Sequence, residues 1–535
     1  MTAKLIRAAI FLVFALLTAV PIFAAGGTCP SGNTIDPNGN PISLSSLGIT
    51  NCFYISQSTG ADTNAGTTEA SPWAHLPGMP SCTGICSSTT PTAGEGFIMR
   101  GGDTWVSSDL GVAWAWSGTS THPLYVGVDL TWFNSSCGAS WCRPVFNAGL
   151  VNITNSNMFQ LANQSYVIVD NLELRGMRNN ENGYINSGGS NVRITQNYIH
   201  GWGHTGSSNN VGFFAQGGAG SMADHNIIDG SDSSQNTFNG FFQWWSQIQY
   251  NYIQYVVSAV LGQTDVVHDN TVLHTVTSTD GDHCNGIFTF SPANGTTQLI
   301  YNNLISNGTS CPGGVVLWFN GNGATDSSWV GYGFGNIMYN LSSNPVNIGN
   351  HPSGNYGTYY WFNNTVDCSV GGCGGTPPSG PSWTIYDNNN HTIPNALNFT
   401  CSGCTVPVCN AGSGVGCTDL TQSSSTATSQ GYTSSEQFPY SPISTCTSLT
   451  CGTVQHGTNV QSYCTALSSI NAAAGGACQR STTAGVSYNT TTHAVIAPAR
   501  ATNARPSSGA WDVGAYLGQQ GPLPNPPSSL AAVVN

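Results

Sequence analysis

Residues 278–290, which read STDGDHCNGIFTF, contain three side chains that could do chemistry: Asp280, Asp282 and His283. They stand out because only 6% of the 535 residues are charged. Two carboxyl groups can supply the acid and the base of glycoside hydrolysis, and a neighbouring histidine can tune one of them. A turn rich in carboxylates could instead bind calcium, or simply hydrogen-bond to its own backbone.

The calcium alternative meets only part of the known pattern. The segment DGDHCNG begins with the Asp-x-Asp of a calcium-binding loop. Cys284 stands at the fifth position of that loop, the glycine comes seventh instead of sixth, and no glutamate follows at the twelfth. A non-standard calcium site at Asp280 and Asp282, completed from other parts of the chain, stays an open alternative.

The elements that position these residues follow a repeat. Ten-residue blocks with asparagine at the sixth place recur 19 to 33 residues apart, with an apolar eighth place and nearly always an apolar third. These asparagines are Asn197, Asn226, Asn251, Asn270, Asn303, Asn336 and Asn364. The third and eighth places can face one core only if the chain bends between them. Asparagine suits a bend because it tolerates left-handed backbone, and stacked asparagines can bond to one another.

A second strand recurs in step with the blocks, as NGYI, VGFF, NGFF, SAVL, NGIF and GGVV. Two short strands per turn, a bend at asparagine and loops of variable length predict an all-β parallel solenoid. A β-sandwich would lack a fixed period with an asparagine corner, and helical repeats need a 3.6-residue pattern. Cys284 and Cys311 precede this strand on consecutive coils, so we expect a disulfide between them, since stacked coils lie about 4.8 Å apart.

The solenoid brings further polar side chains to the coils near Asp280 and Asp282. The ninth place of the block should point outward, and it holds His200 and Asp229 on successive coils. Asp229 and a carboxyl group two coils on would lie about 10 Å apart, near the separations of glycosidase carboxylates. The expected catalytic residues are Asp229, Asp280, Asp282, His283 and His200.

Substrate contacts are expected from residues around that group. Arg175 aligns one coil before His200, and sugar rings stack on exposed aromatic side chains. The expected substrate-binding residues are Arg175, Arg178, His204, Trp202, Trp244, Trp245 and His274. Because adjacent strand residues face opposite sides, one of Trp244 and Trp245 should be exposed.

Two structural alternatives stay open for these residues. Polar side chains in solenoid turns commonly bond to the backbone, and some of the tryptophans could fill the core. A second outward stripe occupies the fourth and fifth places of the blocks, so the face that carries the site is undecided. This stripe consists of Asp224, His225, His268 and Asp269.

Three further segments carry a resemblance to a known family. They read FYISQSTGADTNAGTTEASPWAHLPGM, GEGFIMRGGDTWV and ARPSSGAWDVGAYLG. Together with the repeat, they make the chain over residues 50–518 resemble secreted right-handed parallel β-helix proteins of the pectate-lyase-like superfamily. The resemblance implies polysaccharide chemistry outside the cell. It implies no single reaction, because this fold carries lyases, hydrolases, epimerases, tailspikes and adhesins.

The composition and the start of the sequence limit the cellular location and the classes of partner that we expect. The opening MTAKLIRAAIFLVFALLTAVPIFAAGG has the pattern of a secretory signal peptide, and all 18 cysteines follow it, which predicts disulfides and an extracellular protein. The formal net charge of −13 disfavours nucleic acids and anionic membranes, since both are bound through basic patches. We expect a monomer that acts on an extracellular polysaccharide.

The expected organisation has five parts. They are a signal peptide (1–26), an N-terminal cap with the first coils (27–160), a regular parallel β-helix (161–395), cysteine-rich loops with the closing coils (396–518) and a proline-rich tail (519–535).

The expected activity is narrowed by what the mature chain lacks. The only lysine of the full sequence is Lys4, which lies in the signal peptide. The mature chain therefore has no lysine, which excludes a lysine-based lyase. The Arg-x-Lys element of polygalacturonases and the Asp-Pro-His-Glu of mannuronan epimerases are both missing. We expect hydrolysis of a neutral polysaccharide by paired aspartates. The alternatives are a lyase that uses Arg175 or Arg178 with calcium as its cofactor, and a non-catalytic glycan-binding or adhesin solenoid.

Overall fold

The computed structural model describes most of the chain between residues 26 and 517. The segments outside the described residues are 1–25, 32–33, 179–182, 204–212, 234–238, 243, 277–284, 291–296, 308–315, 320–329, 342–344, 350–356, 369–373, 376–382, 396–397, 400–417, 433–444, 483–484, 499–502 and 518–535.

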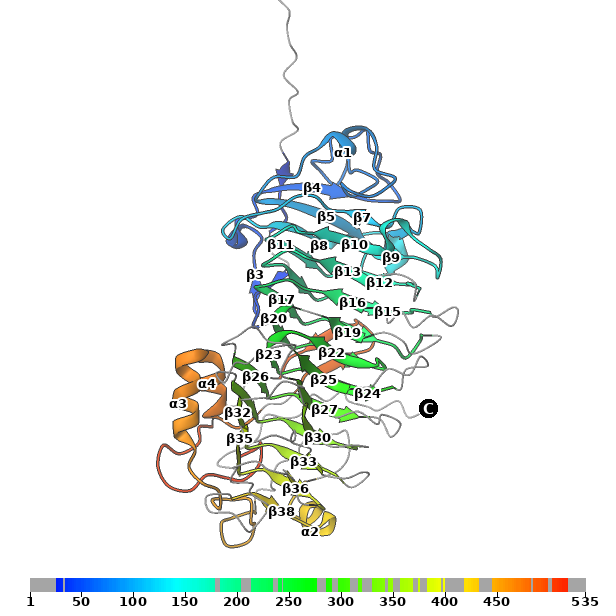
Figure 1. Ribbon diagram of the computed structural model, residues 1–535. Helices are drawn as coiled ribbons and strands as arrows, with labels where there is room; N and C mark the ends of the chain where they lie inside the picture. The colour runs from blue at the N-terminus through cyan, green and yellow to red at the C-terminus, as the bar shows by residue number, and fades with distance from the viewer. Residues whose placement is uncertain are drawn as a thin grey trace, which may run out of the picture.

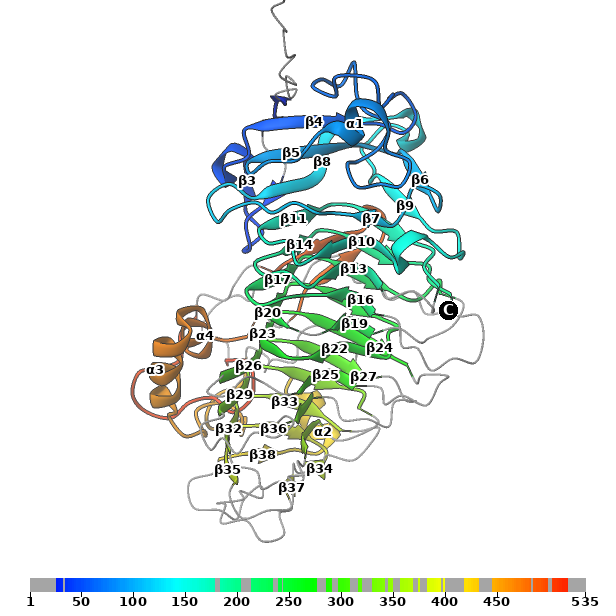
Figure 2. The same cartoon turned by 45° about the horizontal axis from the view of Figure 1, so that its top comes forward.

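Three long sheets run side by side along the molecule (Figures 1 and 2). Sheet 1 contains, in spatial order, β1 (Gly27–Thr28), β4 (Asn51–Ile55), β5 (Glu95–Gly101), β8 (Leu124–Phe133), β11 (Val167–Asp170), β14 (Arg193–Thr195), β17 (Ser221–Asp224), β20 (Trp245–Gln249), β23 (Thr264–His268), β26 (Thr297–Tyr301), β29 (Val330–Phe334), β32 (Gly357–Phe362) and β35 (Trp383–Asn388). Sheet 2 contains β6 (Thr104–Val106), β9 (Val145–Asn147), β12 (Glu173–Arg175), β15 (Tyr198–His200), β18 (Ile227–Asp229), β21 (Tyr252–Gln254), β24 (Thr271–Thr275), β27 (Leu304–Asn307), β30 (Ile337–Tyr339), β33 (Thr365–Asp367), β36 (His391–Ile393) and β38 (Leu420–Thr421). Sheet 3 contains β7 (Val112–Ala113), β10 (Asn157–Ala162), β13 (Gly183–Ser187), β16 (Phe213–Gln216), β19 (Asn239–Phe242), β22 (Ser258–Gly262), β25 (Asn285–Phe290), β28 (Val316–Phe319) and β31 (Val346–Gly349).

Within these sheets every pairing except that of β1 with β4 is parallel, and neighbouring strands come from successive coils. This arrangement is the parallel β-solenoid that the repeat predicts, and it is the right-handed parallel β-helix that the resemblance implies. One detail differs from the expectation of two strands per turn. The bend splits each ten-residue block into a strand of sheet 1 and a strand of sheet 2, so a full coil has three strands.

The bend is made by the residue before each asparagine. That residue has a left-handed backbone, with φ between 52° and 65°, at Gln196, His225, Tyr250, Asp269, Asn302, Gly335, Asn363 and Asn389. A single left-handed residue turns the chain sharply and costs little when the surrounding hydrogen bonds fix it. The turn lets the third and eighth places of each block both reach the core, as at Ile194 and Ile199, which are fully buried.

The asparagines themselves form a continuous ladder inside the corner. Each side-chain Nδ2 donates to Oδ1 of the asparagine on the next coil, over 2.9–3.1 Å from Asn197 to Asn390. The same Oδ1 also accepts the backbone N–H of the preceding rung. The predicted stacking of asparagines is therefore confirmed, and it satisfies polar groups that are fully buried.

Segments from both ends of the chain pack against the outside of the coils. Helices α3 (Gln461–Ile470) and α4 (Ala472–Cys478) lie beside the strands of sheet 1 (Figure 1). They cover aromatic side chains on the outer face of that sheet. The hairpin of β39 (Ser487–Asn489) and β40 (Ala494–Ile496) packs on the outer face of sheet 2. The remaining described elements are β2 (Thr34–Ile35), β3 (Pro41–Ile42), α1 (Gly84–Ser88), β34 (Gly374–Gly375), β37 (Asn398–Phe399), α2 (Ser424–Ser429) and the 3-10 turns Ser45–Leu47, Ser135–Cys137 and Thr154–Ser156.

Disulfides staple the two ends of the β-helix. The described bridges are Cys29–Cys52, Cys82–Cys86, Cys137–Cys142, Cys446–Cys451 and Cys464–Cys478. No described cysteine is a free thiol, as expected for structural disulfides. The predicted bridge between Cys284 and Cys311 lies outside the described residues.

The ladder ends on a carboxyl group. Asp419 occupies the rung after Asn390 and accepts its backbone N–H over 2.6 Å, while Asp387 accepts its side-chain Nδ2 over 2.6 Å. Burial and mutual repulsion raise the pKa of Asp387 well above its usual range, and burial raises the pKa of Asp419 to about 6. Two neighbouring buried carboxylates cannot both ionise cheaply, so the pair keeps a proton at mildly acidic pH.

We expect Asn251→Ala to destabilise the fold by about 2–4 kcal/mol, because it leaves buried partners on both adjacent coils without bonds. The Asn251 side chain bonds to Ala223, Gln249, Asn226 and Asn270. Urea unfolding measures the effect, with exposed Asn503→Ala as the control. An equal loss in both variants would contradict a structural role for the ladder.

We expect Asp419→Asn to stabilise the chain increasingly as pH rises from about 4 to 7, by roughly 1–3 kcal/mol. A carboxyl group whose folded pKa is raised contributes stability at low pH and loses it as pH rises through the folded value. The amide also continues the ladder without a charge. Thermal unfolding of both proteins across this pH range tests the expectation, and a difference that does not change with pH would refute it.

Candidate functional site

Strands β12, β15, β18 and β21 each end in a polar residue on the outer face of sheet 2. The backbone pairs are Arg175 with His200, His200 with Asp229, and Asp229 with Gln254. These residues stand at the ninth place of the block, and each follows a residue of the apolar core. Side-chain alternation therefore directs them away from the core, and stacking brings them together on successive coils.

His200 is the centre of an ionic cluster on this face. Its Nδ1 lies 2.7 Å from Asp232 Oδ2, and its Nε2 lies 3.2 Å from Glu173 Oε1. Glu173 also pairs with Arg175 at 3.1 Å, and the backbone N–H of Gly201 donates to Asp232 Oδ1 over 2.9 Å. The Asp232 side chain is 52% exposed, whereas the His200 side chain is only 9% exposed. The cluster thus presents one accessible carboxylate, that of Asp232, which is held in place by His200 and Gly201.

The contacts within the cluster shift the pKa values of His200, Asp232 and Glu173. Burial would lower the pKa of His200, but hydrogen bonds to Asp232 and Glu173 and their charges raise it above its usual range. Burial would raise the pKa of Asp232 and of Glu173, but the contacts with His200 hold both below their usual range. The two carboxylates therefore favour the imidazolium form of His200, and His200 favours the ionised form of both carboxylates.

The C-terminal hairpin forms one wall of the cluster. The Tyr198 ring stacks between His200 and His493, with ring centroids 4.0 Å and 4.1 Å away. Tyr488 of β39 bonds to His493 Nδ1 over 2.6 Å, and Arg143 donates to the carbonyl of Thr492 in the same hairpin over 3.0 Å. These contacts explain why His200, which points away from the core, is nevertheless buried.

Asp229 lies deeper than the sequence predicts. The residue is buried, and its Oδ1 accepts the backbone N–H of Ser231 over 2.9 Å, as a turn residue does. Burial, and after it the charge of Asp229, raises the pKa of Tyr488 to about 12, which places this carboxylate near the hairpin. Asp232, three residues further on, is the more accessible carboxylate. Asp232 is not among the site residues expected from the sequence, because nothing in its spacing indicates its contact with His200.

Two other predicted residues have structural partners. Arg178 donates to Asn152 Oδ1 over 3.3 Å, one coil earlier. The His274 ring stacks on Tyr255 with centroids 5.0 Å apart, and its backbone is left-handed. Neither residue contacts the His200 cluster in any described interaction.

Several predicted residues lie outside the described part of the chain. They are His204, Asp280, Asp282 and His283. The predicted pairing of Asp229 with Asp280 or Asp282, and the calcium alternative at the latter two, therefore stay predictions.

The three predicted tryptophans have different surroundings. Trp202 and Trp245 are buried in the core of the β-helix, so neither ring is presented to a substrate. The expectation that Trp202 and Trp245 bind substrate is therefore wrong, and both side chains fill the core instead. Trp244 is 46% exposed and has a left-handed backbone, φ 55°, at the corner between sheets 3 and 1. The contrast between Trp244 and Trp245 follows from the alternation of side chains.

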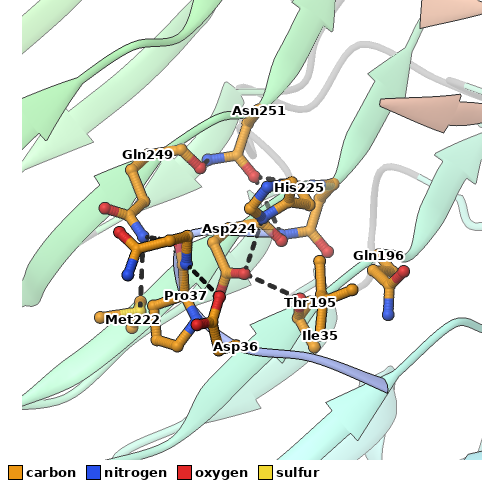
Figure 3. A network of polar contacts seen from close by, with 12 residues as sticks. Ile35, Asp36, Pro37, Thr195, Gln196, Met222, Asp224, His225, Gln249 and Asn251 are labelled. Carbon is orange, nitrogen blue, oxygen red and sulfur yellow. Dashed lines mark hydrogen bonds and ion pairs between the residues drawn. The ribbon is translucent and has the colours of Figure 1, made fainter. Parts of the chain in front are cut away.

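The second outward stripe forms two Asp–His pairs. Asp224 Oδ2 lies 2.9 Å from His225 Nδ1, and Asp269 Oδ2 lies 2.6 Å from His268 Nδ1. Arg193 clamps Asp224 through Nε and Nη2, over 2.8 Å and 2.7 Å. Figure 3 shows the first pair beneath the loop of residues Ile35, Asp36 and Pro37.

The described residues provide neither a metal-binding cluster nor a membrane-spanning helix. Among them, no group of three or more His, Cys, Asp or Glu side chains is placed to hold a metal ion. Within the same residues, no helix has both the length and the apolar character needed to cross a bilayer.

Comparisons with known proteins concern the fold. No protein-family model matches the chain, and no curated protein matches its sequence. Among solved structures, it is similar to the GH136 lacto-N-biosidase from Eubacterium ramulus, with 12% identity over 67% of this chain and 68% of that one, at a TM-score of 0.39. It is also similar to pectate lyase Pel9A, with 13% identity over 88% of this chain and 96% of that one, at a TM-score of 0.40. At these identities and scores we draw no argument about activity from either structure.

We expect His200→Gln to destabilise the fold more at about pH 6 than at about pH 9. Because the folded pKa of His200 is raised above 6.5, its contribution is complete below that value and is lost as pH rises through the folded pKa. Urea unfolding at both pH values measures this, with the exposed His456→Gln as the control. A loss that is equal at both pH values would contradict a charged His200.

Proposed function

We propose that this protein is a secreted carbohydrate-active enzyme that hydrolyses a neutral polysaccharide on the outer face of sheet 2. One observation carries the proposal: Asp232 is half-exposed, ionised and held by His200 and Gly201 in a cluster with Glu173 and Arg175. A fixed, deprotonated carboxylate on an open face is what a general base or a nucleophile of glycoside hydrolysis requires.

The second carboxyl group is assigned to the loop that follows β24. Asp280 and Asp282 belong to that loop in the sequence, and β24 lies two coils beyond β18, which precedes Asp232. Two coils correspond to about 10 Å, close to the ~6.5–9.5 Å between the carboxyl groups of inverting glycosidases. We therefore assign Asp232 as the base, Asp280 or Asp282 as the acid, and Asp229 as a support for the base.

Elimination by an arginine base has less support. Arg175 is engaged in an ion pair with Glu173, and Arg178 donates to Asn152. A lyase base must be free to accept a proton from the carbon next to a uronate. The net charge of −13 also opposes an anionic substrate unless a cation bridges it, which favours a neutral glycan.

Secretion is part of the proposal. The signal-peptide pattern at the start of the chain and the five described disulfides support an extracellular location.

We expect Asp232→Asn to lower the rate of polysaccharide hydrolysis about a hundred- to ten-thousandfold, because the amide cannot accept a proton. Release of reducing ends from a panel of neutral and uronate polysaccharides measures the rate. Asp265→Asn, an exposed aspartate on sheet 1, is the matched control and should keep full activity. Asp280→Asn and Asp282→Asn identify the acid, since only the true donor should cause a comparable loss.

Three results would overturn the assignment. Calcium-dependent formation of unsaturated products would mean elimination, and the carboxylate pair would be wrong. Binding of a polysaccharide without release of any product would mean a non-catalytic glycan-binding solenoid. Full activity of Asp232→Asn would place the catalytic residues elsewhere on the β-helix.

A further inference from the structure

A pocket of about 670 Å³ lies on the corner between sheets 1 and 2, apart from the His200 cluster. Its floor is formed by the corner residues Gln196, His225 and Tyr250, together with Arg143. One wall is the turn of the β2–β3 hairpin, residues 38–40, and the other is β40 with the residues up to Pro498. Two segments from opposite ends of the chain therefore enclose one space over consecutive coils.

The polar groups on the floor are only partly satisfied. Arg143 is buried and donates to the carbonyl of Gln196 and to that of Thr492, which uses three of its five N–H groups. It forms no described ion pair, although burial, which lowers its pKa to about 10, leaves it charged at neutral pH. His225 Nε2 is buried and has no partner among the described residues. Unsatisfied buried groups of this kind are costly unless a ligand or water pairs with them.

The Asp224–His225 pair determines whether His225 Nε2 donates or accepts a hydrogen bond. Burial would raise the pKa of Asp224, but the Arg193 guanidinium and His225 hold it below its usual range, so it is an acceptor only. His225 must then donate its Nδ1 proton to Asp224, as the contact in Figure 3 indicates. In the neutral imidazole, Nε2 is left as a lone-pair acceptor.

These groups define the chemistry of a ligand. It must donate a hydrogen bond to His225 Nε2 and accept one from Arg143, and a hydroxyl group does both. A carboxylate has no proton for Nε2 and would also approach the charge of Asp224, which bonds to Nδ1 of the same ring. A cation would meet the charge of Arg143. The Tyr250 ring, which is buried and also lines the pocket, stacks on His225 with centroids 5.0 Å apart and holds the imidazole in place.

We propose that the pocket enclosed by the β2–β3 and β39–β40 hairpins is a binding site for a neutral saccharide, separate from the catalytic cluster. Gln196 in the pocket and His200 in the cluster are four residues apart on one coil, at most about 13 Å of chain. Tyr488 and His493 of the β39–β40 hairpin face the cluster, whereas Ala494 and Val495 line the pocket. The same hairpin therefore separates the two sites.

Binding is tested in the Asp232→Asn protein, so that the result does not depend on catalysis. The probes are neutral hexoses and their methyl glycosides, with the corresponding uronates as charged counterparts. Saturation-transfer NMR detects binding, and calorimetric titration gives the Kd. We expect the neutral sugars to bind in the millimolar range and the uronates to bind at least about tenfold more weakly.

Two variants locate the ligand. Ala494→Trp fills the pocket from the hairpin and should abolish binding. His225→Asn keeps a residue that this corner already accepts, as at Asn302 and Asn363, but removes the imidazole with its Nε2 and should weaken binding about tenfold. The controls are Thr491→Ala at the hairpin tip and His456→Asn, both exposed and outside the pocket. Unfolding temperatures show whether each variant is folded. If Ala494→Trp does not fold, His225→Asn tests the location of the ligand.

Three results would overturn the inference: no binding of any neutral sugar, binding that both pocket variants leave unchanged, or tighter binding of the uronates. Sugar binding that is lost in the pocket variants, in a protein that cleaves no polysaccharide, would support the pocket and reject only the proposed hydrolysis. Hydrolysis without sugar binding in the pocket would do the reverse.

Discussion

The asparagine ladder is the interaction on which the rest of the structure depends. A parallel β-helix with a sharp corner buries a backbone that turns, and its polar groups there cannot all find strand partners. Each asparagine resolves this by bonding to the coil before it, to its own coil and to the coil after it, as Asn251 does. The ladder also keeps successive coils in register, so residues about 28 positions apart become lateral neighbours.

Register turns a sparse set of charged residues into local clusters. Only 6% of the chain is charged, yet Glu173, Arg175, His200 and Asp232 come from three consecutive coils and contact one another. The left-handed corner between sheets 1 and 2 also brings side chains from successive coils together. Because its side chains project outward at every turn, it places Gln196 and His225 side by side on a surface that other segments can cover.

The segments that cover the coils decide what is accessible. The C-terminal hairpin buries His200 and stacks on Tyr198, while α3 and α4 cover the aromatic rows of sheet 1. The outward faces of a solenoid are therefore not equivalent to solvent-exposed faces. Here the covering leaves Asp232 open beside the hairpin and encloses the pocket on its other side. Both proposed sites thus arise where a terminal segment meets the outer surface of the coils.

The sequence by itself determined the β-helix, the asparagine corner, the inward residues and the alignment of Arg175, His200 and Asp229. All of these follow from period and alternation, which are local properties of strands. It left undecided which outward residues are buried, that Asp232 rather than Asp229 is accessible, and that Trp202 fills the core. Those outcomes depend on contacts across hundreds of residues, such as that of Arg143 with Thr492, for which no periodicity exists. Only the tertiary structure, which returns the C-terminal segment along the coils, fixes them.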